Sequence, residues 1–164
     1  FVKSLEFFGV AYGGTNSNDA LYLANNGASM GFTDLYLEQT FHHEYSSILY
    51  RNHTSWFDEK GWTAINPYGF IYNDPENGVG AIRNNASSQE LDTLLCKKGF
   101  LTQYSQSSLE NDLNTFAQNL FSPSEGFWEI ADKYPAIRRK MKLLVSFYNQ
   151  IDPAFTEDYF RSLH

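Results

Sequence analysis

A change of sequence pattern near residue 30 constrains the fold of this chain more than any other feature. Before it, residues 5–12 and 20–23 are rich in side chains that favour strands, and turn signals follow them at Gly13-Gly14 and at residues 25–27. After it, most apolar residues recur at helical spacing. We therefore predict an α+β domain, in which a small strand region precedes a mostly helical part.

The helical part divides at capping and turn residues. The first predicted helix is capped by Asp34 and runs to about Asn52, with an apolar residue at nearly every turn. Residues 53–86 hold most of the Gly, Pro and Asn turn-formers, so we predict a long, aromatic-rich loop there. Further helices are predicted over residues 87–99, 109–121, 125–133, 135–151 and 153–163.

Length and composition exclude several classes of protein. The chain has 164 residues, 42% of them hydrophobic, so we expect a single domain over residues 1–164 with a true core. It begins at Phe1 rather than Met, and we expect it to be the C-terminal part of a longer precursor. A net charge of −7 disfavours a nucleic-acid partner. The sequence contains no run of about 18 apolar residues, the length that a membrane-spanning helix needs. The single Cys96 is expected to be buried and free.

The first predicted helix carries most of a zinc-peptidase motif. Such enzymes need three protein ligands, a metal-bound water and a base that deprotonates the water. The HExxH motif supplies two histidine ligands on one helical face, with the glutamate between them as the base. Here the helix reads His43-Glu44-Tyr45-Ser46-Ser47, so serine stands where the second histidine belongs. A neutral hydroxyl is a poor zinc ligand beside imidazole.

Three segments together resemble a known family. Residues 41–49, FHHEYSSIL, resemble the HHEFxHIL helix of the substrate-import-associated zinc metallohydrolase lipoproteins. Residues 99–105, GFLTQYS, resemble the GFVSxYA segment of that family, and residues 113–118, LNTFAQ, resemble its EDFAE helix. Order and approximate spacing agree across residues 35–121. The resemblance implies a gluzincin-like, zincin-type metallopeptidase fold.

The resemblance also assigns roles to residues of this chain. His43 corresponds to the first zinc ligand, Glu44 to the general base, and Tyr104 to a tyrosine that stabilises the oxyanion. Ser47 stands at the position of the second histidine ligand, and Asn114 at that of the third-ligand glutamate. In the same helix, glutamine replaces a second acidic residue at position 118. The metal site is therefore expected to be degenerate.

This degenerate site leads to two functional hypotheses. The favoured one is a non-catalytic binding or accessory module, a pseudoenzyme that belongs to an outer-membrane nutrient-uptake system and takes a peptide or glycan ligand. It implies no cofactor, importer-associated partner proteins, and an exported, periplasmic or outer-membrane-anchored location. The alternative is an active zinc-dependent peptidase that uses non-standard ligands.

Other readings of the polar residues remain open. His53 follows His43 by ten residues, as in longer zinc motifs, but those need a helix break that a glycine usually supplies, and none is present here. Asp112 or Glu110 could join His42 or His43 in another metal site. The plainest reading is that the histidines and the adjacent glutamate are ordinary helix residues.

Two further groups of side chains offer candidate sites. A catalytic triad with a histidine can be drawn from Asp92, Ser105 and Asp112, but no nucleophile-elbow glycine pattern accompanies it. The aromatic residues of the predicted loop either form a stacking surface for a carbohydrate or peptide, or pack into the core. They are Trp56, Phe57, Trp62, Tyr68, Phe70 and Tyr72.

Overall fold

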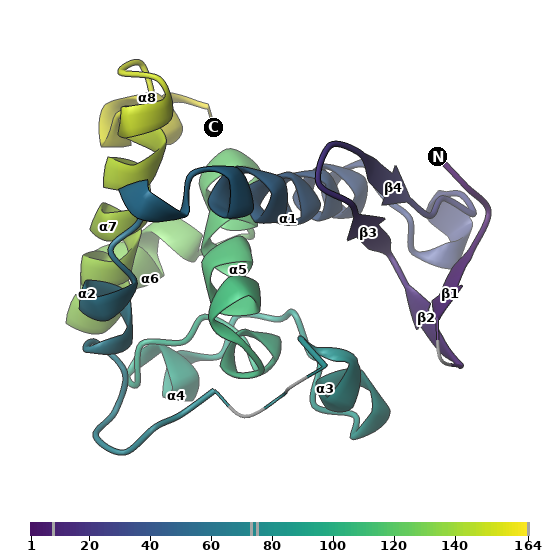
Figure 1. The fold of residues 1–164 in the computed structure, drawn as a ribbon, viewed down its shortest axis with the longest axis horizontal. Helices are drawn as coiled ribbons and strands as arrows, with labels where there is room; N and C mark the ends of the chain where they lie inside the picture. The colour runs from purple at the N-terminus through teal and green to yellow at the C-terminus, as the bar shows by residue number, and fades with distance from the viewer. Residues whose placement is uncertain (8, 73, 75, 164) are drawn as a thin grey trace.

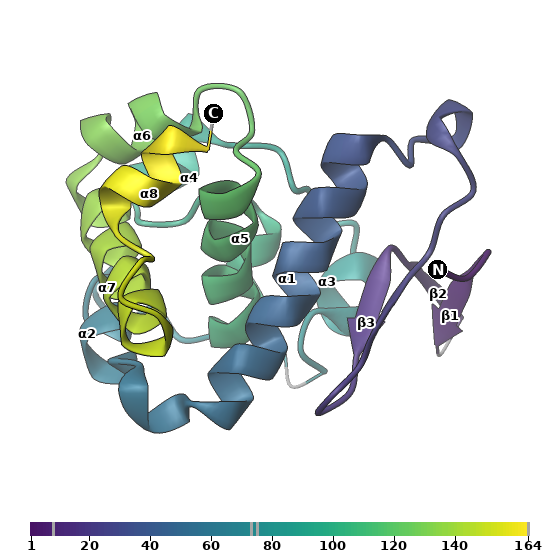
Figure 2. The same cartoon turned by 90° about the horizontal axis from the view of Figure 1, so that it is seen from above.

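The computed structural model describes residues 1–7, 9–72, 74 and 76–163, and shows a helix-rich chain with two small antiparallel sheets (Figure 1). This arrangement confirms the α+β prediction. Phe8 of the predicted first strand, and Asn73 and Pro75 of the predicted loop, lie outside the described residues. The helix α1 (Asp34–Asn52) has the strands on one side and the other long helices on the opposite side (Figure 2).

The strand region consists of two hairpins. Strand β1 (Leu5–Phe7) pairs with β2 (Val10–Tyr12), and β3 (Gly14–Asn16) pairs with β4 (Leu21–Leu23). The prediction of one strand over residues 5–12 was wrong, because the chain turns at Gly9, whose φ of 73° is the left-handed conformation that glycine tolerates. Strand β3 was not predicted, since Gly and Asn are poor strand formers.

The long helices follow the sequence prediction closely. Helix α1 matches its predicted bounds, although its cap is Thr33, whose hydroxyl accepts from the Tyr36 amide at 3.2 Å. Two other helices also have the predicted bounds, and two C-terminal helices are shorter than predicted. These are α5 (Leu109–Phe121), α7 (Pro135–Ile151), α6 (Phe127–Lys133) and α8 (Glu157–Ser162).

The region between α1 and α5 departs most from the prediction. The predicted loop over residues 53–86 contains short helices, and the predicted helix over residues 87–99 shrinks to a single turn. That turn is fixed by Asp92, whose carboxylate caps the amides of Leu94 and Leu95, and it ends before Gly99 at φ 92°. The short elements are α2 (Glu59–Thr63), α3 (Val79–Arg83), α4 (Thr93–Cys96), and the 3₁₀ turns η1 (Ala28–Met30), η2 (Thr54–Trp56) and η3 (Tyr104–Gln106).

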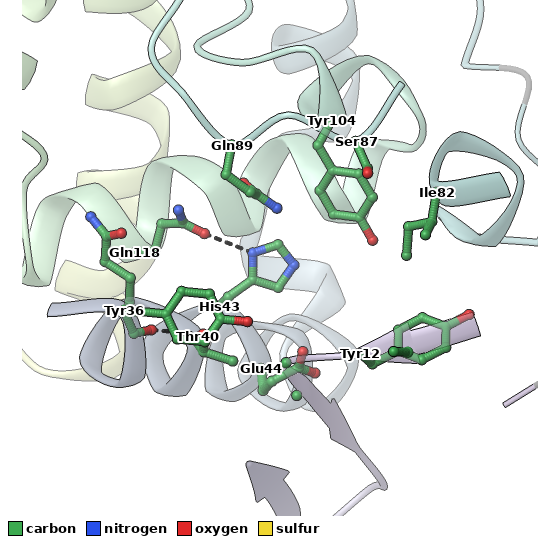
Figure 3. Close-up of a pocket in the computed structure, with 14 residues that line it drawn as sticks. Tyr12, Tyr36, Thr40, His43, Glu44, Ile82, Ser87, Gln89, Tyr104 and Gln118 are labelled. Carbon is green, nitrogen blue, oxygen red and sulfur yellow. Dashed lines mark hydrogen bonds between the residues drawn. The ribbon is translucent and has the colours of Figure 1, made fainter. Parts of the chain in front are cut away.

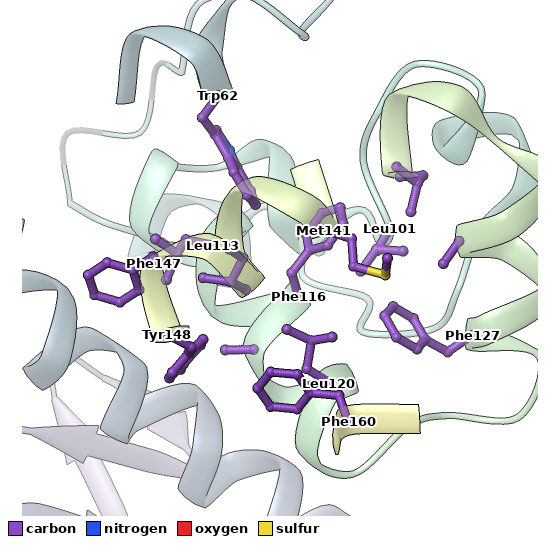
Figure 4. Packing of buried hydrophobic residues seen from close by; sticks show 14 of the residues in the cluster. Trp62, Leu101, Leu113, Phe116, Leu120, Phe127, Met141, Phe147, Tyr148 and Phe160 are labelled. Atoms are coloured by element: carbon purple, nitrogen blue, oxygen red, sulfur yellow. The ribbon is translucent and has the colours of Figure 1, made fainter. Parts of the chain in front are cut away.

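The hydrophobic core lies on the side of α5 that faces the C-terminal helices (Figure 4). Leu113, Phe116 and Leu120 of α5 are fully buried, as is Trp62 of α2. Cys96 is buried and free, as predicted, and burial raises the pKa of its thiol to about 11. Across the described ranges, every helix is too short or too polar to cross a bilayer.

A buried ion pair ties the loop region to this core. Asp112 of α5 and Lys140 of α7 are both fully buried, and the Lys140 Nζ lies 2.5 Å from the Asp112 Oδ2. The same oxygen accepts from the Trp62 indole at 2.9 Å and from the Tyr72 hydroxyl at 2.5 Å. Lys140 also lies over the Phe100 ring, 4.3 Å from its centroid. Asp112 is thus a structural anchor, which removes it from the triad and metal-site readings of the sequence.

Candidate functional site

A ladder of polar contacts connects α1 to α5. The two helices run antiparallel, and each contact lies one turn further along α1 and one turn back along α5. A polar contact therefore recurs at every fourth position along this interface. The contacts are Gln39 to the Ser122 carbonyl at 2.8 Å, His43 to Gln118 at 2.9 Å, Ser47 to Asn114 at 2.7 Å, and Arg51 to Glu110 at 3.0 Å.

The two degenerate ligand positions meet in this ladder. The Asn114 Nδ2 donates to the Ser47 Oγ, and the two residues are only 1% and 2% exposed. Within the described part of the chain, the Asn114 Oδ1 has no hydrogen-bond partner. Positions that would both carry zinc ligands in the resembling family thus face each other here, but their side chains bind one another.

His43 is held in one orientation by the neighbouring contact. Its Nδ1 lies 2.9 Å from the Gln118 Oε1, and an amide oxygen can only accept. The Nδ1 therefore carries the proton and donates, which leaves the lone pair of the neutral ring on Nε2. Figure 3 shows the ring between Gln118 and Tyr104, and the centroids of the His43 and Tyr104 rings are 6.1 Å apart.

Glu44 faces the strands rather than α5. Its Oε2 accepts a hydrogen bond of 2.5 Å from the Asn16 side chain on β3. This approach requires glycine at position 14, because a Cβ there would lie 2.8 Å from the Glu44 Cγ and 2.7 Å from a methyl carbon of Thr40. The Gly13-Gly14 pair, which the sequence suggested only as a turn, therefore brings the backbone of β3 against α1.

Tyr104, in the turn η3, supplies the opposite wall of the site (Figure 3). Burial raises the pKa of its hydroxyl well above the usual range, and the Glu44 carboxylate raises it further. The hydroxyl is therefore a neutral donor at physiological pH. That state is compatible with the oxyanion role that the resemblance assigns to it.

These side chains enclose a pocket of about 220 Å³. Helix α1 supplies one wall, residues 11–14 of the two hairpins supply a second, and residues 82–104 supply the third (Figure 3). His43, Glu44, Tyr104 and Gln118 all line it, whereas Ser47 and Asn114 are not among the described lining residues. The remaining lining residues are Ala11, Tyr12, Gly13, Gly14, Tyr36, Gln39, Thr40, Ile82, Ser87 and Gln89.

Other predicted histidine sites are not assembled. His53 stacks on Trp56, with ring centroids 4.4 Å apart, at the C-terminal end of α1. His42 stacks on Phe121 at 4.2 Å, and its burial there lowers the pKa of the imidazole to about 4. The reading that pairs Glu110 with a histidine is wrong in this structure, because its carboxylate is bound to Arg51.

The structure also decides between the alternatives for the triad and for the aromatic residues of the predicted loop. The carboxylate of Asp92 caps α4, and the Ser105 hydroxyl donates to the Thr102 carbonyl at 2.8 Å, so neither meets a histidine. Of the two alternatives for the aromatic residues, packing into the core holds for Phe57 and Trp62, whereas Tyr68 is fully exposed.

The residues at the ligand positions do not fit zinc. Ser47 and Asn114 offer neutral oxygen and amide groups that are already bound to each other, and the His43 Nδ1 is engaged by Gln118. Among the described residues, no three His, Cys, Asp or Glu side chains lie close enough together to hold a metal ion.

Comparison of the chain with protein families, with curated proteins and with solved structures finds no match.

Proposed function

We propose that this chain is a zincin-like domain that has lost its metal site and acts as a non-catalytic binding or accessory module. The observation that carries the proposal is the buried hydrogen bond between Ser47 and Asn114. It joins the two positions that the family resemblance assigns to zinc ligands. The hydrogen bond pairs two buried polar groups with each other, in the space that a metal and its ligands would otherwise fill.

The pocket above this contact provides the binding site in the proposal. It keeps polar groups suited to a ligand: the oriented His43 ring, the Glu44 carboxylate and the Tyr104 hydroxyl. A peptide or glycan segment offers matching donors and acceptors. On the strength of the family resemblance, we place the domain in the cell envelope, beside the importer proteins of a nutrient-uptake system.

The alternative function is an active zinc peptidase with non-standard ligands. One observation favours it, since the groups assigned as first ligand, base and oxyanion stabiliser share one pocket. In that case Gln118 or Asn114 would have to release its present partner and bind the metal. The two functions differ most directly in metal content.

Elemental analysis of the purified, dialysed protein tests the proposal. We expect substantially less than one zinc per chain, in the parent and in a His43→Ala variant alike. His53→Ala is the matched control, because that histidine lies outside the pocket. About one zinc per chain that disappears in His43→Ala but persists in His53→Ala would overturn the proposal and favour the active enzyme.

A further inference from the structure

The charge of the pocket lining suggests what kind of ligand it takes. Among the described residues that line the pocket, Glu44 is the only carboxylate, and Lys and Arg are absent. A carboxylate in a partly enclosed site interacts strongly with a nearby charge, because little water screens it. The lining therefore favours a positively charged ligand group and disfavours an anion.

The hydrogen bonding of Glu44 leaves one oxygen available. Asn16 donates to Oε2, and in the described part of the chain Oε1 receives no hydrogen bond and Glu44 has no ion-pair partner. Arg51 donates to the other end of the Asn16 side chain, but it does not line the pocket and pairs with Glu110 at 3.0 Å. The negative charge of Glu44 is thus positioned by a neutral amide rather than neutralised by a cation.

The aromatic walls add to this preference. Tyr12, Tyr36 and Tyr104 line the pocket, and the faces of aromatic rings attract cations. Next to the lining residue Ile82, Arg83 of α3 is 2.8 Å from the Glu76 carboxylate. Burial is the largest cause of the raised pKa of Tyr104, and the charges of Glu44 and Asp74 raise it further, which indicates a negative potential at its hydroxyl.

The size of the pocket limits the ligand further. Its volume of about 220 Å³ is below the roughly 300–1,000 Å³ of sites for drug-sized compounds. Such a pocket accepts one side chain or one small molecule. We propose that it binds a guanidinium or alkylammonium group on a short chain, with the cation hydrogen-bonded to the Glu44 Oε1 and flanked by the tyrosine rings. This inference rests on the proposed metal-free binding function.

Calorimetric titration of EDTA-treated protein with n-butylguanidinium and n-butylurea tests the inference, because the two probes share a shape and differ in charge. At pH 8 we expect the guanidinium to bind at least tenfold more tightly. Glu44→Gln should abolish that preference while keeping an acceptor for Asn16. Glu38→Gln, the matched control on the same helix outside the pocket, should retain it.

The tripeptide acetyl-Gly-Arg-Gly-amide distinguishes the two sources of such a group. Tighter binding of the tripeptide than of n-butylguanidinium would assign the pocket to an arginine side chain of a protein partner, and equal or weaker binding to a free small cation. Either result supports the inference if it depends on Glu44.

The inference would be overturned if the parent protein bound the guanidinium and the urea equally well, or bound pentanoate more tightly than the guanidinium. This comparison uses the parent protein alone, so it holds even if Glu44→Gln fails to fold. Because EDTA removes metal, such a result would leave the metal-free function intact. One zinc per untreated chain would instead refute that function.

Discussion

Replacing Lys140 by Met should destabilise the protein strongly, because it leaves a buried carboxylate without its counter-ion. Asp112 and Lys140 are both fully buried. Burial raises the pKa of Asp112, and the lysine opposes that rise by charge and by hydrogen bonding. Methionine keeps much of the length of the lysine chain beside Trp62 and Phe100, so the main loss is electrostatic.

The structure sets the expected size of this effect. Breaking a buried ion pair by removing one partner costs about 3–5 kcal/mol, and a domain has about 5–15 kcal/mol of stability in total. The Trp62 indole and the Tyr72 hydroxyl still donate to Asp112, which limits the loss to the lower part of that range.

The effect should also depend on pH. Without Lys140, the pKa of Asp112 in the folded variant rises further above its unfolded value, so the folded state binds more protons than the unfolded state. Stability then falls as the pH rises. Urea unfolding followed by circular dichroism should show a larger penalty for Lys140→Met at pH 8 than at pH 5.

The double variant Asp112→Asn with Lys140→Met is the control. The asparagine oxygen still accepts from the indole of Trp62 and the hydroxyl of Tyr72 but carries no charge, so the double variant should be more stable than Lys140→Met alone at pH 8. A single variant that loses less than about 1 kcal/mol, or a penalty that does not change with pH, would refute this reasoning.

Three further changes test other parts of the structure. Burial lowers the pKa of His42 from 6.5 to about 4, so the free energy of unfolding should fall by about 2 kcal/mol as the pH drops between those values, after allowance for partial exposure. His42→Leu should flatten that part of the profile in urea titrations. Gly14→Ala should cost about 1–3 kcal/mol in thermal unfolding, since its Cβ would crowd the Cγ of Glu44 at 2.8 Å; parent-like stability would mean that β3 lies further from α1. Ser47→Ala should cost about 1–3 kcal/mol because the Asn114 amide loses its acceptor, and adding Asn114→Leu should recover part of that loss.

The helices show how far local sequence signals reach. Helices α1, α5 and α7 could be predicted because each combines a cap or first-turn proline with a long apolar repeat. The strand hairpins are harder to predict from the sequence, because their strands are three residues long and the turn at Gly9 depends on one positive φ. Tertiary contacts fix such short elements, and a local pattern does not record them.

The residues of the candidate site likewise include some that the sequence identified and some that it did not. The motif identified His43 and Glu44, and the family resemblance singled out Tyr104, all of which line one pocket. Two residues were missed, because only hairpin pairing brings them to the site: Tyr12, which lines the pocket, and Asn16, which donates to Glu44. The ladder between α1 and α5 did leave a signal, since both helices carry a polar residue at every fourth position of the shared face. The family resemblance implies that Ser47 and Asn114 meet, because it assigns both to one metal site, whereas the polar pattern alone does not set the register of the two helices.

The proposed function requires that Ser47 and Asn114 occupy the positions of lost zinc ligands around His43. The double variant Ser47→His with Asn114→Glu tests it most directly, by measuring the melting temperature with and without zinc. A ligand present at a thousandfold excess over its Kd stabilises the folded state by about 4 kcal/mol, or roughly 10 °C for a domain of this size. We expect that rise in the double variant, a smaller one in each single variant, and none in the parent. A folded double variant whose melting temperature does not change with zinc would show that Ser47 and Asn114 do not occupy ligand positions of one metal site.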